Sequence, residues 1–173
     1  MSVSTHLTPE PERRLWIILE QMRQGGEQAD WKLFALAAFA AGQLAFVRSL
    51  GDAGPSGLLA LASLCAALPL GVFAFSPMAG TPRWLPLLDP SRGRPGAGDR
   101  LIAADDVVKY SQTELVNRFD KYLGGGITAT PYYEDIVAGI LVAARIAARK
   151  RRLLRAACLL VGVAQLGLLG LLF

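Results

Sequence analysis

The sequence is poor in side chains that bind metals or form disulfides. Its 173 residues include two cysteines and one histidine, and both cysteines lie inside apolar stretches, at Cys65 and Cys158. A disulfide framework needs more cysteines in exposed loops, and a metal site needs several ligands at regular spacing. We therefore predict no metal site and no cofactor, and we expect the two cysteines to behave as small apolar residues.

Signals for catalysis are also scarce. The glycine run at 124–126 is not followed by Gly-Lys-Ser/Thr, which excludes a Walker A loop. The acid pairs Asp105–Asp106 and Glu134–Asp135 are neighbours in sequence, so their side chains point to different sides of a helix. Both pairs also lie near expected helix starts, where negative charge is favoured. We predict no catalytic residues and no enzymatic activity.

What the sequence has in abundance is apolar residues gathered in blocks. Hydrophobic residues make up 53% of the chain, and the apolar blocks lie at 31–47, 57–75 and 156–173. A helix of about 20 apolar residues crosses the hydrocarbon core of a bilayer, and 17 is near the lower limit. The sequence therefore predicts an all-α integral membrane protein with about three transmembrane helices and a helical cytoplasmic loop region.

This pattern divides the chain into four segments. Residues 1–30 are expected to form a cytoplasmic N-terminal amphipathic helix, and residues 31–76 a transmembrane helical hairpin. Residues 77–152 are expected to form a cytoplasmic helical sensing region, and residues 153–173 the C-terminal transmembrane helix.

The polar segments carry local helix signals. An apolar stripe with helical spacing predicts a short first helix that ends near Gly25–Gly26; its members are Leu15, Ile18, Leu19 and Met22. Ser111 and Glu114 form a capping box, so a helix should begin at Ser111 and end at the glycine run 124–126. Thr130 and Pro131 predict the start of one helix that continues to the C-terminus. Residues 76–98 are rich in Pro, Gly and Arg and should lack regular structure.

The distribution of cations predicts the orientation. Residues 1–32 carry four Lys or Arg, the turn between the first two apolar blocks carries Arg48, and residues 77–155 carry thirteen. By the positive-inside rule, the N-terminus and the long loop are cytoplasmic and the C-terminus lies outside, in a multi-pass protein of the inner (plasma) membrane. No run of cations alternates with aromatic residues, so the net charge of +4 does not predict nucleic-acid binding.

The basic cluster before the last apolar block has two interpretations. As a topology anchor beside the lipid bilayer it needs no further explanation. Alternatively, part of it binds an anionic ligand, because helical spacing places three of its cations on one face. The candidate ligand-binding residues are Arg145, Arg149, Lys150 and Arg152.

Within the apolar blocks, the strongly polar side chains are two uncharged glutamines, Gln43 and Gln165. Without a charged group there, an ordinary ion-coupled transporter is not indicated. Small residues recur four apart and allow helices to approach closely, at Ala38/Gly42, Ala41/Ala45 and Ala62/Ala66. So small a bundle with so little polar lining predicts that several copies assemble into a homo-oligomer.

Three stretches of the sequence, Ala29-Asp30-Trp31-Lys32, residues 105–109 with the capped helix after them, and residues 135–155, together resemble the transmembrane effectors of Pycsar, a bacterial antiphage system. Ala29-Asp30-Trp31-Lys32 is similar to the A-D-x-K start of the family's first span. Residues 105–109, followed by the capped helix that begins at Ser111, are similar to the stretch after the family's hairpin. Residues 135–155 resemble its C-terminal half, in which R-I-A-x-x-K and a basic run lead into the last span. The resemblance covers roughly residues 15–173.

The resemblance implies a function. A partner cyclase would make a cyclic pyrimidine nucleotide on infection, and the effector would sense this second messenger on its cytoplasmic side. The effector would then impair membrane integrity and cause abortive infection. The alternative is a structural or anchoring subunit of a larger membrane complex, with the basic loop as its docking surface.

Overall fold

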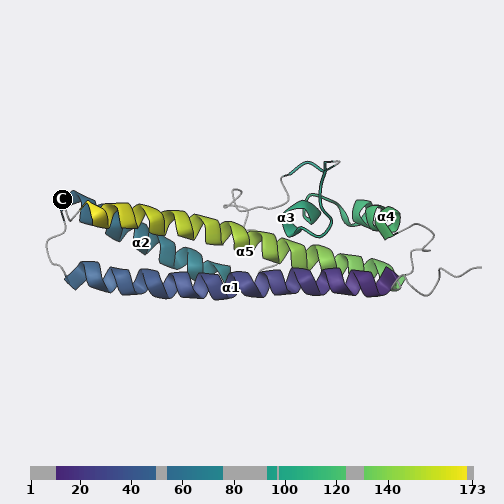
Figure 1. Cartoon of the computed structure of the whole chain (residues 1–173), viewed down its shortest axis with the longest axis horizontal. Coiled ribbons are helices and arrows are strands. Elements are labelled where there is room, and N and C mark those ends of the chain that lie inside the picture. Colours follow the sequence, from purple (N-terminus) through teal and green to yellow (C-terminus); the bar gives the residue numbers. More distant parts are fainter. Residues whose placement is uncertain (1–10, 50–53, 76–92, 97, 124–130, 171–173) are drawn as a thin grey trace, which may run out of the picture. The chain divides into compact units, whose positions relative to one another are not determined.

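All the regular secondary structure in the described part of the chain is helical. The computed structural model describes residues 11–49, 54–75, 93–96, 98–123 and 131–170, and no strand occurs among them. The helices, shown in Figure 1, are α1 (Pro11–Ser49), α2 (Pro55–Ala74), α3 (Ala104–Val107), α4 (Gln112–Leu123) and α5 (Pro131–Leu169). Glu12–Ser49, Pro55–Ala74 and Pro131–Leu169 are each long and apolar enough to cross a membrane. The predicted all-α membrane protein with three spans is confirmed.

The chain forms two compact units. Met1–Gly26 and Thr81–Ala148 make up the first, which we call the loop unit. Glu27–Gly80 and Arg149–Phe173 make up the second, which we call the span unit. Helices α1 and α5 each contribute residues to both units.

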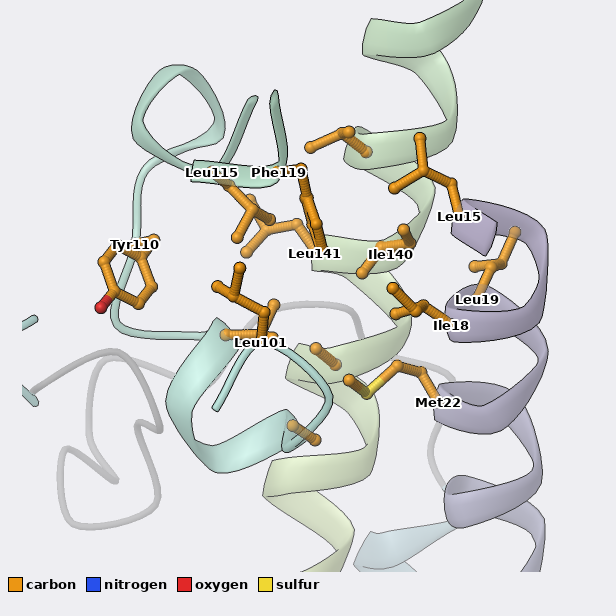
Figure 2. Packing of buried hydrophobic residues seen from close by; sticks show 14 of the residues in the cluster. Leu15, Ile18, Leu19, Met22, Leu101, Tyr110, Leu115, Phe119, Ile140 and Leu141 are labelled. Atoms are coloured by element: carbon orange, nitrogen blue, oxygen red, sulfur yellow. The ribbon is translucent and has the colours of Figure 1, made fainter. Parts of the chain in front are cut away.

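The loop unit is built around a core of large apolar side chains (Figure 2). The predicted stripe of α1 is buried in this core, with Leu15, Ile18, Leu19 and Met22 at most 7% exposed. The stripe meets the apolar face of α5, which includes Ile140 and Leu141. Burying such a side chain stabilises a fold by about 1.5–3 kcal/mol, so this core is a principal source of the unit's stability.

Helix α4 belongs to the same unit and begins as predicted. The backbone N–H of Ser111 donates to Glu114 Oε2 at 2.9 Å, and the N–H of Glu114 donates to Ser111 Oγ at 3.3 Å. These reciprocal bonds satisfy two backbone donors that a helix start leaves unpaired, which confirms the capping box. Leu115 and Phe119 lie on the buried face of α4, so its opposite face is left for solvent and ligands.

The expected end of the first helix near Gly25–Gly26 is wrong, because α1 continues to Ser49. A glycine inside a helix costs about 1 kcal/mol relative to alanine. Buried side chains on both sides of the pair, including Met22, Ala29 and Leu33, outweigh that cost. The predicted long helix from Pro131 is confirmed as far as Leu169. Residues 76–92 and 124–130 lie outside the described residues, so the structure does not test the irregular segment expected at 76–92 or the glycine run at 124–126. Residues 93–96 are described and are not helical.

The span unit has small side chains in its interior and large apolar side chains on its surface, the opposite of a soluble protein. Its interior is rich in alanine, with Ala40, Ala60, Leu64, Ala67, Val161 and Ala164 buried together. Large apolar side chains point outward instead, and Trp31, Val72 and Leu159 are each at least 70% exposed. Small residues between helices and large ones facing outward are typical of helices in lipid.

The closest approach in the span unit involves Gly167 of α5. A Cβ at this position would lie 2.8 Å from the backbone oxygen of Ser56 and 3.2 Å from the Cβ of Ala60, both on α2. Even a methyl group would therefore force the backbone to shift, and glycine allows α2 and α5 to pack this closely.

Candidate functional site

The loop unit contains a polar network around the Asp99 carboxylate, formed by residues between Gly96 and Arg118. Asp99 Oδ2 accepts hydrogen bonds from the backbone N–H of Gly96 at 2.7 Å and from the Tyr110 hydroxyl at 2.8 Å. Asp99 Oδ1 accepts a bond from Lys109 Nζ at 2.8 Å. The pairing with Lys109, followed by these two other donors, holds the pKa of Asp99 well below its usual range. This carboxylate stays ionised at neutral pH, and both of its oxygens already accept hydrogen bonds from the protein.

Lys109 holds a second carboxylate as well. Its Nζ lies 2.6 Å from Asp106 Oδ1, and Asp106 Oδ2 accepts the backbone N–H of Arg100 at 3.1 Å. Hydrogen bonds to Asp106 and Asp99 raise the pKa of Lys109 above its usual range, and the same contact with Lys109 lowers the pKa of Asp106. Asp106 therefore has a structural role here. Helix α3, which carries it, was not predicted as an element.

Arg118 of α4 joins this network from the other side. Its guanidinium carbon lies 4.7 Å from the centre of the Tyr110 ring, and its Nη2 donates to the backbone oxygen of Gly96 at 3.3 Å. Figure 2 shows the Tyr110 hydroxyl pointing away from the apolar cluster. Since a guanidinium carries five N–H donors, Arg118 retains several for another acceptor.

A pocket of about 990 Å³ opens beside this network. One wall is the polar face of α4, and the other is the stretch that leads into α3. Its lining comprises Asp99, Arg100, Leu101, Ile102, Ala103, Asn117, Arg118, Lys121 and Tyr122. Three of these residues are cations and one, Asp99, is an acid. Lys109 pairs with both Asp99 and Asp106, so that group keeps one net negative charge, which the three cations outnumber. The pocket is therefore electropositive.

The span unit contains two polar contacts made by adjacent residues of α5. Arg149, only 5% exposed, donates from Nη2 to the backbone oxygen of Phe73 at 3.3 Å, and its guanidinium lies 4.9 Å from the centre of the Phe73 ring. Phe73 is in the last turn of α2, where carbonyl groups lack partners within the helix and a cation is favoured. Lys150 Nζ lies 2.6 Å from Asp30 Oδ2 on α1. Residues 149 and 150 therefore join α5 to both other helices of the unit.

The structure distributes the four predicted ligand-binding residues between the units. Arg145 is exposed and belongs to the loop unit; Arg149, Lys150 and Arg152 belong to the span unit. Arg149 and Lys150 make the protein contacts just described. The residues of the pocket were not predicted as a site, although the four-residue spacing of Asn117–Lys121 and Arg118–Tyr122 on a helix already places these side chains in two adjacent rows.

The other expected signals can be located as well. Glu134 and Asp135 are both exposed in the first turn and a half of α5, and no group of three His, Cys, Asp or Glu residues that could hold a metal ion occurs among the described residues. Cys65 and Cys158 are free thiols.

Comparison with known proteins identifies the family of the chain. No curated protein and no solved structure matches the chain. Residues 14–173 match the Pycsar effector protein domain, close to the range over which the sequence showed the resemblance. Because this match covers nearly the whole chain, the chain belongs to the Pycsar effector protein domain family, and its three helices long enough to span a membrane fit a membrane effector of antiphage defence.

Proposed function

We propose that this protein impairs the membrane of the infected cell when a cyclic pyrimidine nucleotide binds to its cytoplasmic part. The loss of membrane integrity would end the infection together with the cell. The protein would act by rearranging its helices and would catalyse no reaction. The N-terminus and the loop between α2 and α5 would be cytoplasmic, and the C-terminus would lie on the outer side of the inner membrane.

The observation that carries this proposal is the continuity of α5. Residues Pro131–Leu169 form one helix, and the boundary between the two units falls within it, between Ala148 and Arg149. The first two residues after this boundary are the ones that hold α1 and α2. A ligand that reorders the loop unit would therefore act on the helix directly before the contacts that close the bundle.

The packing of the span unit supports a reversible change. Alanine and glycine form much of its interior, so little buried apolar area is lost when the helices shift. To move the bundle from 1:99 to 99:1 in favour of a permeable state, ligands must supply about 5.5 kcal/mol of differential binding. If several copies change state together, each bound ligand needs to supply only part of this free energy.

The outer surface of the span unit supports assembly. The small residues that recur four apart are all exposed: Ala38, Ala41, Gly42, Ala45, Ala62 and Ala66. No atom lies within 4 Å of a Cβ built at Gly42, so this position does not serve packing within the described part of one chain. A neighbouring copy can approach closely along these rows.

The sequence-based prediction places the phosphate at four cations of α5, Arg145, Arg149, Lys150 and Arg152; it stays a prediction, and a location within the loop unit is the alternative to it. Two of them, Arg149 and Lys150, also hold the bundle together. A nucleotide that competes for these two side chains would loosen α5 from α1 and α2.

The test is to interrupt α5 at the boundary between the units. Cells producing the protein are supplied with cyclic CMP or cyclic UMP by a co-expressed cyclase, and membrane integrity is followed by uptake of propidium iodide. Gly-Gly inserted after Ala148 should abolish uptake while nucleotide binding to the purified protein persists. Gly-Gly inserted after Gly54, in the turn before α2, is the control and should leave uptake unchanged.

Two results would count against the proposal. If the insertion after Ala148 still permits uptake on signal, coupling through α5 is wrong. If neither nucleotide makes cells with the unaltered protein permeable, the effector mechanism is wrong and the role of an anchoring subunit is favoured.

A further inference from the structure

We propose that the electropositive pocket of the loop unit is the nucleotide site, with Arg100, Arg118 and Lys121 binding the phosphate and Tyr122 and Ile102 contacting the base. This inference rests on the proposed function and assigns its ligand a location different from the basic cluster of α5. All the residues involved belong to the loop unit.

Size and shape suit a nucleotide. Small-molecule sites enclose roughly 300–1,000 Å³ and combine apolar walls with a few polar groups. The pocket, at about 990 Å³, has this mixed character and is at the upper end of the range. A cyclic mononucleotide would fill part of it, which leaves room for water around the sugar.

The charges are arranged for an anion. Asp99 would repel a phosphate, but its oxygens accept hydrogen bonds from Lys109, Tyr110 and the Gly96 backbone, and the three cations of the pocket outnumber the one net negative charge of the Asp99–Lys109–Asp106 group. The side chains of Arg100 and Lys121 are exposed, whereas Arg118 is held by the Tyr110 ring and the Gly96 oxygen. A guanidinium held in place loses less conformational freedom on binding than a mobile one, and it is suited to paired hydrogen bonds with phosphate oxygens.

The apolar wall provides a place for a base. Tyr122 and Ile102 are 59% and 48% exposed and both line the pocket. Stacking of a base on an aromatic ring contributes to affinity without selecting a sequence or base type. Asn117 carries both a donor and an acceptor, which is what discrimination between the edges of cytosine and uracil requires.

The experiment measures binding to the full chain in dodecyl maltoside micelles, which contain no phosphate. Cyclic CMP and cyclic UMP are the probes in isothermal titration calorimetry, and cytidine and uridine report binding without phosphate. Arg100→Gln, Arg118→Gln and Lys121→Gln should each weaken cyclic nucleotide binding by about tenfold or more, the usual result of losing a hydrogen bond between charged groups. Cytidine and uridine, which lack the phosphate, should bind the unaltered protein no more tightly than the cyclic nucleotides bind these variants.

Control variants separate this site from its rival. Arg23→Gln removes an exposed cation of the same unit outside the pocket and should change nothing. Arg145→Gln tests the basic face of α5 and should likewise bind as the unaltered protein does. Arg118→Gln also removes the contacts with Tyr110 and Gly96, so Arg100→Gln and Lys121→Gln, whose side chains are exposed, keep the test valid if Arg118→Gln does not fold.

Three results would overturn the inference. If Arg145→Gln loses binding and the pocket variants do not, the pocket assignment is wrong and the effector proposal stands. If the unaltered protein binds neither cyclic nucleotide, the proposed activation fails together with the pocket. If phosphatidylglycerol vesicles bind the unaltered protein, fail to bind Lys121→Gln and displace the nucleotide, the pocket takes a lipid headgroup instead.

Discussion

Lys150 of α5 and Asp30 of α1 form an ion pair of 2.6 Å although 120 residues separate them in the sequence. Their side chains are only 18% and 31% exposed. The second carboxylate oxygen, Asp30 Oδ1, is buried with no hydrogen-bond partner among the described residues. Asp30 therefore depends on Lys150 more than a surface carboxylate depends on its partner.

A double-mutant cycle tests this dependence. Lys150→Met should lower the thermal unfolding midpoint in detergent more than the double variant Asp30→Asn with Lys150→Met, because the single change leaves a carboxylate unpaired. The coupling free energy should be about 1 kcal/mol, the upper end for exposed pairs, since both groups are partly shielded. Lys32→Met removes an exposed cation two residues from Asp30 and should have little effect. Additive effects of the two changes would contradict the pairing.

The second prediction concerns the contact of α5 with α2. Gly167→Ala places a methyl group 2.8 Å from the Ser56 backbone oxygen, which cannot move aside as a flexible side chain would. The variant should therefore unfold at a lower temperature, by an overpacking cost of about 1–3 kcal/mol. Gly162→Ala is the matched control on the same helix, because no atom lies within 4 Å of a Cβ there. It should be neutral or slightly stabilising, since alanine favours helix more than glycine does.

The third prediction is a pH dependence of the loop unit. The folded protein lowers the pKa of Asp99, so the folded state binds this proton less tightly than the unfolded state does. The stability contributed by Asp99 is thus complete well above pH ~4, the value for an unfolded aspartate, and declines as the pH falls below it. The difference in unfolding midpoint between the unaltered protein and Asp99→Asn should be constant from pH 5 to 8 by scanning fluorimetry, and smaller at pH ~3.5. A difference that grows on acidification would show that the sign is wrong.

The fourth prediction concerns assembly. Gly42→Leu places bulk in an exposed row of small residues and should shift chemically cross-linked protein in native membranes towards monomer. Val72→Leu enlarges another exposed side chain outside these rows and should leave the cross-linked pattern unchanged. Equal cross-linking of Gly42→Leu and the unaltered protein would exclude this row as the contact between copies.

The fifth prediction is topology. Alkaline phosphatase is active only after export, so a fusion after Phe173 should be active and an insertion at Gly125 inactive. The cation distribution provides the reason, with thirteen Lys or Arg in residues 77–155 and one, Arg48, in the last turn of α1, next to the connection to α2. An inactive fusion after Phe173 would mean that the number of membrane crossings is even.

The parts of the fold that sequence predicts well are those set by neighbours along the chain. The stripe from Leu15 to Met22, the Ser111–Glu114 box and the start of α5 at Pro131 each depend on residues within a few positions. The same local reasoning placed a helix end at Gly25–Gly26, and it failed there because burial of more distant side chains decided the outcome.

The polar sites could not be predicted in this way. Arg118 reaches the Gly96 oxygen across 22 residues, and Arg149 reaches the Phe73 oxygen across 76. Such contacts depend on which segments pack against each other in the fold. The spacing of charges along one helix does not show which segment the helix packs against. The basic cluster of α5 was visible as charge, but the sequence alone did not show that Arg149 caps α2 or that Lys150 holds Asp30.

The two helices that enter both units differ in stiffness where they cross between them. Helix α1 crosses directly after Gly25–Gly26, and α5 crosses between Ala148 and Arg149. Paired glycines are where a helix kinks at least cost, whereas alanine and arginine are among the best helix formers. In the activation that we propose, α1 would therefore bend at its glycine pair more readily than α5 would bend at Ala148 and Arg149.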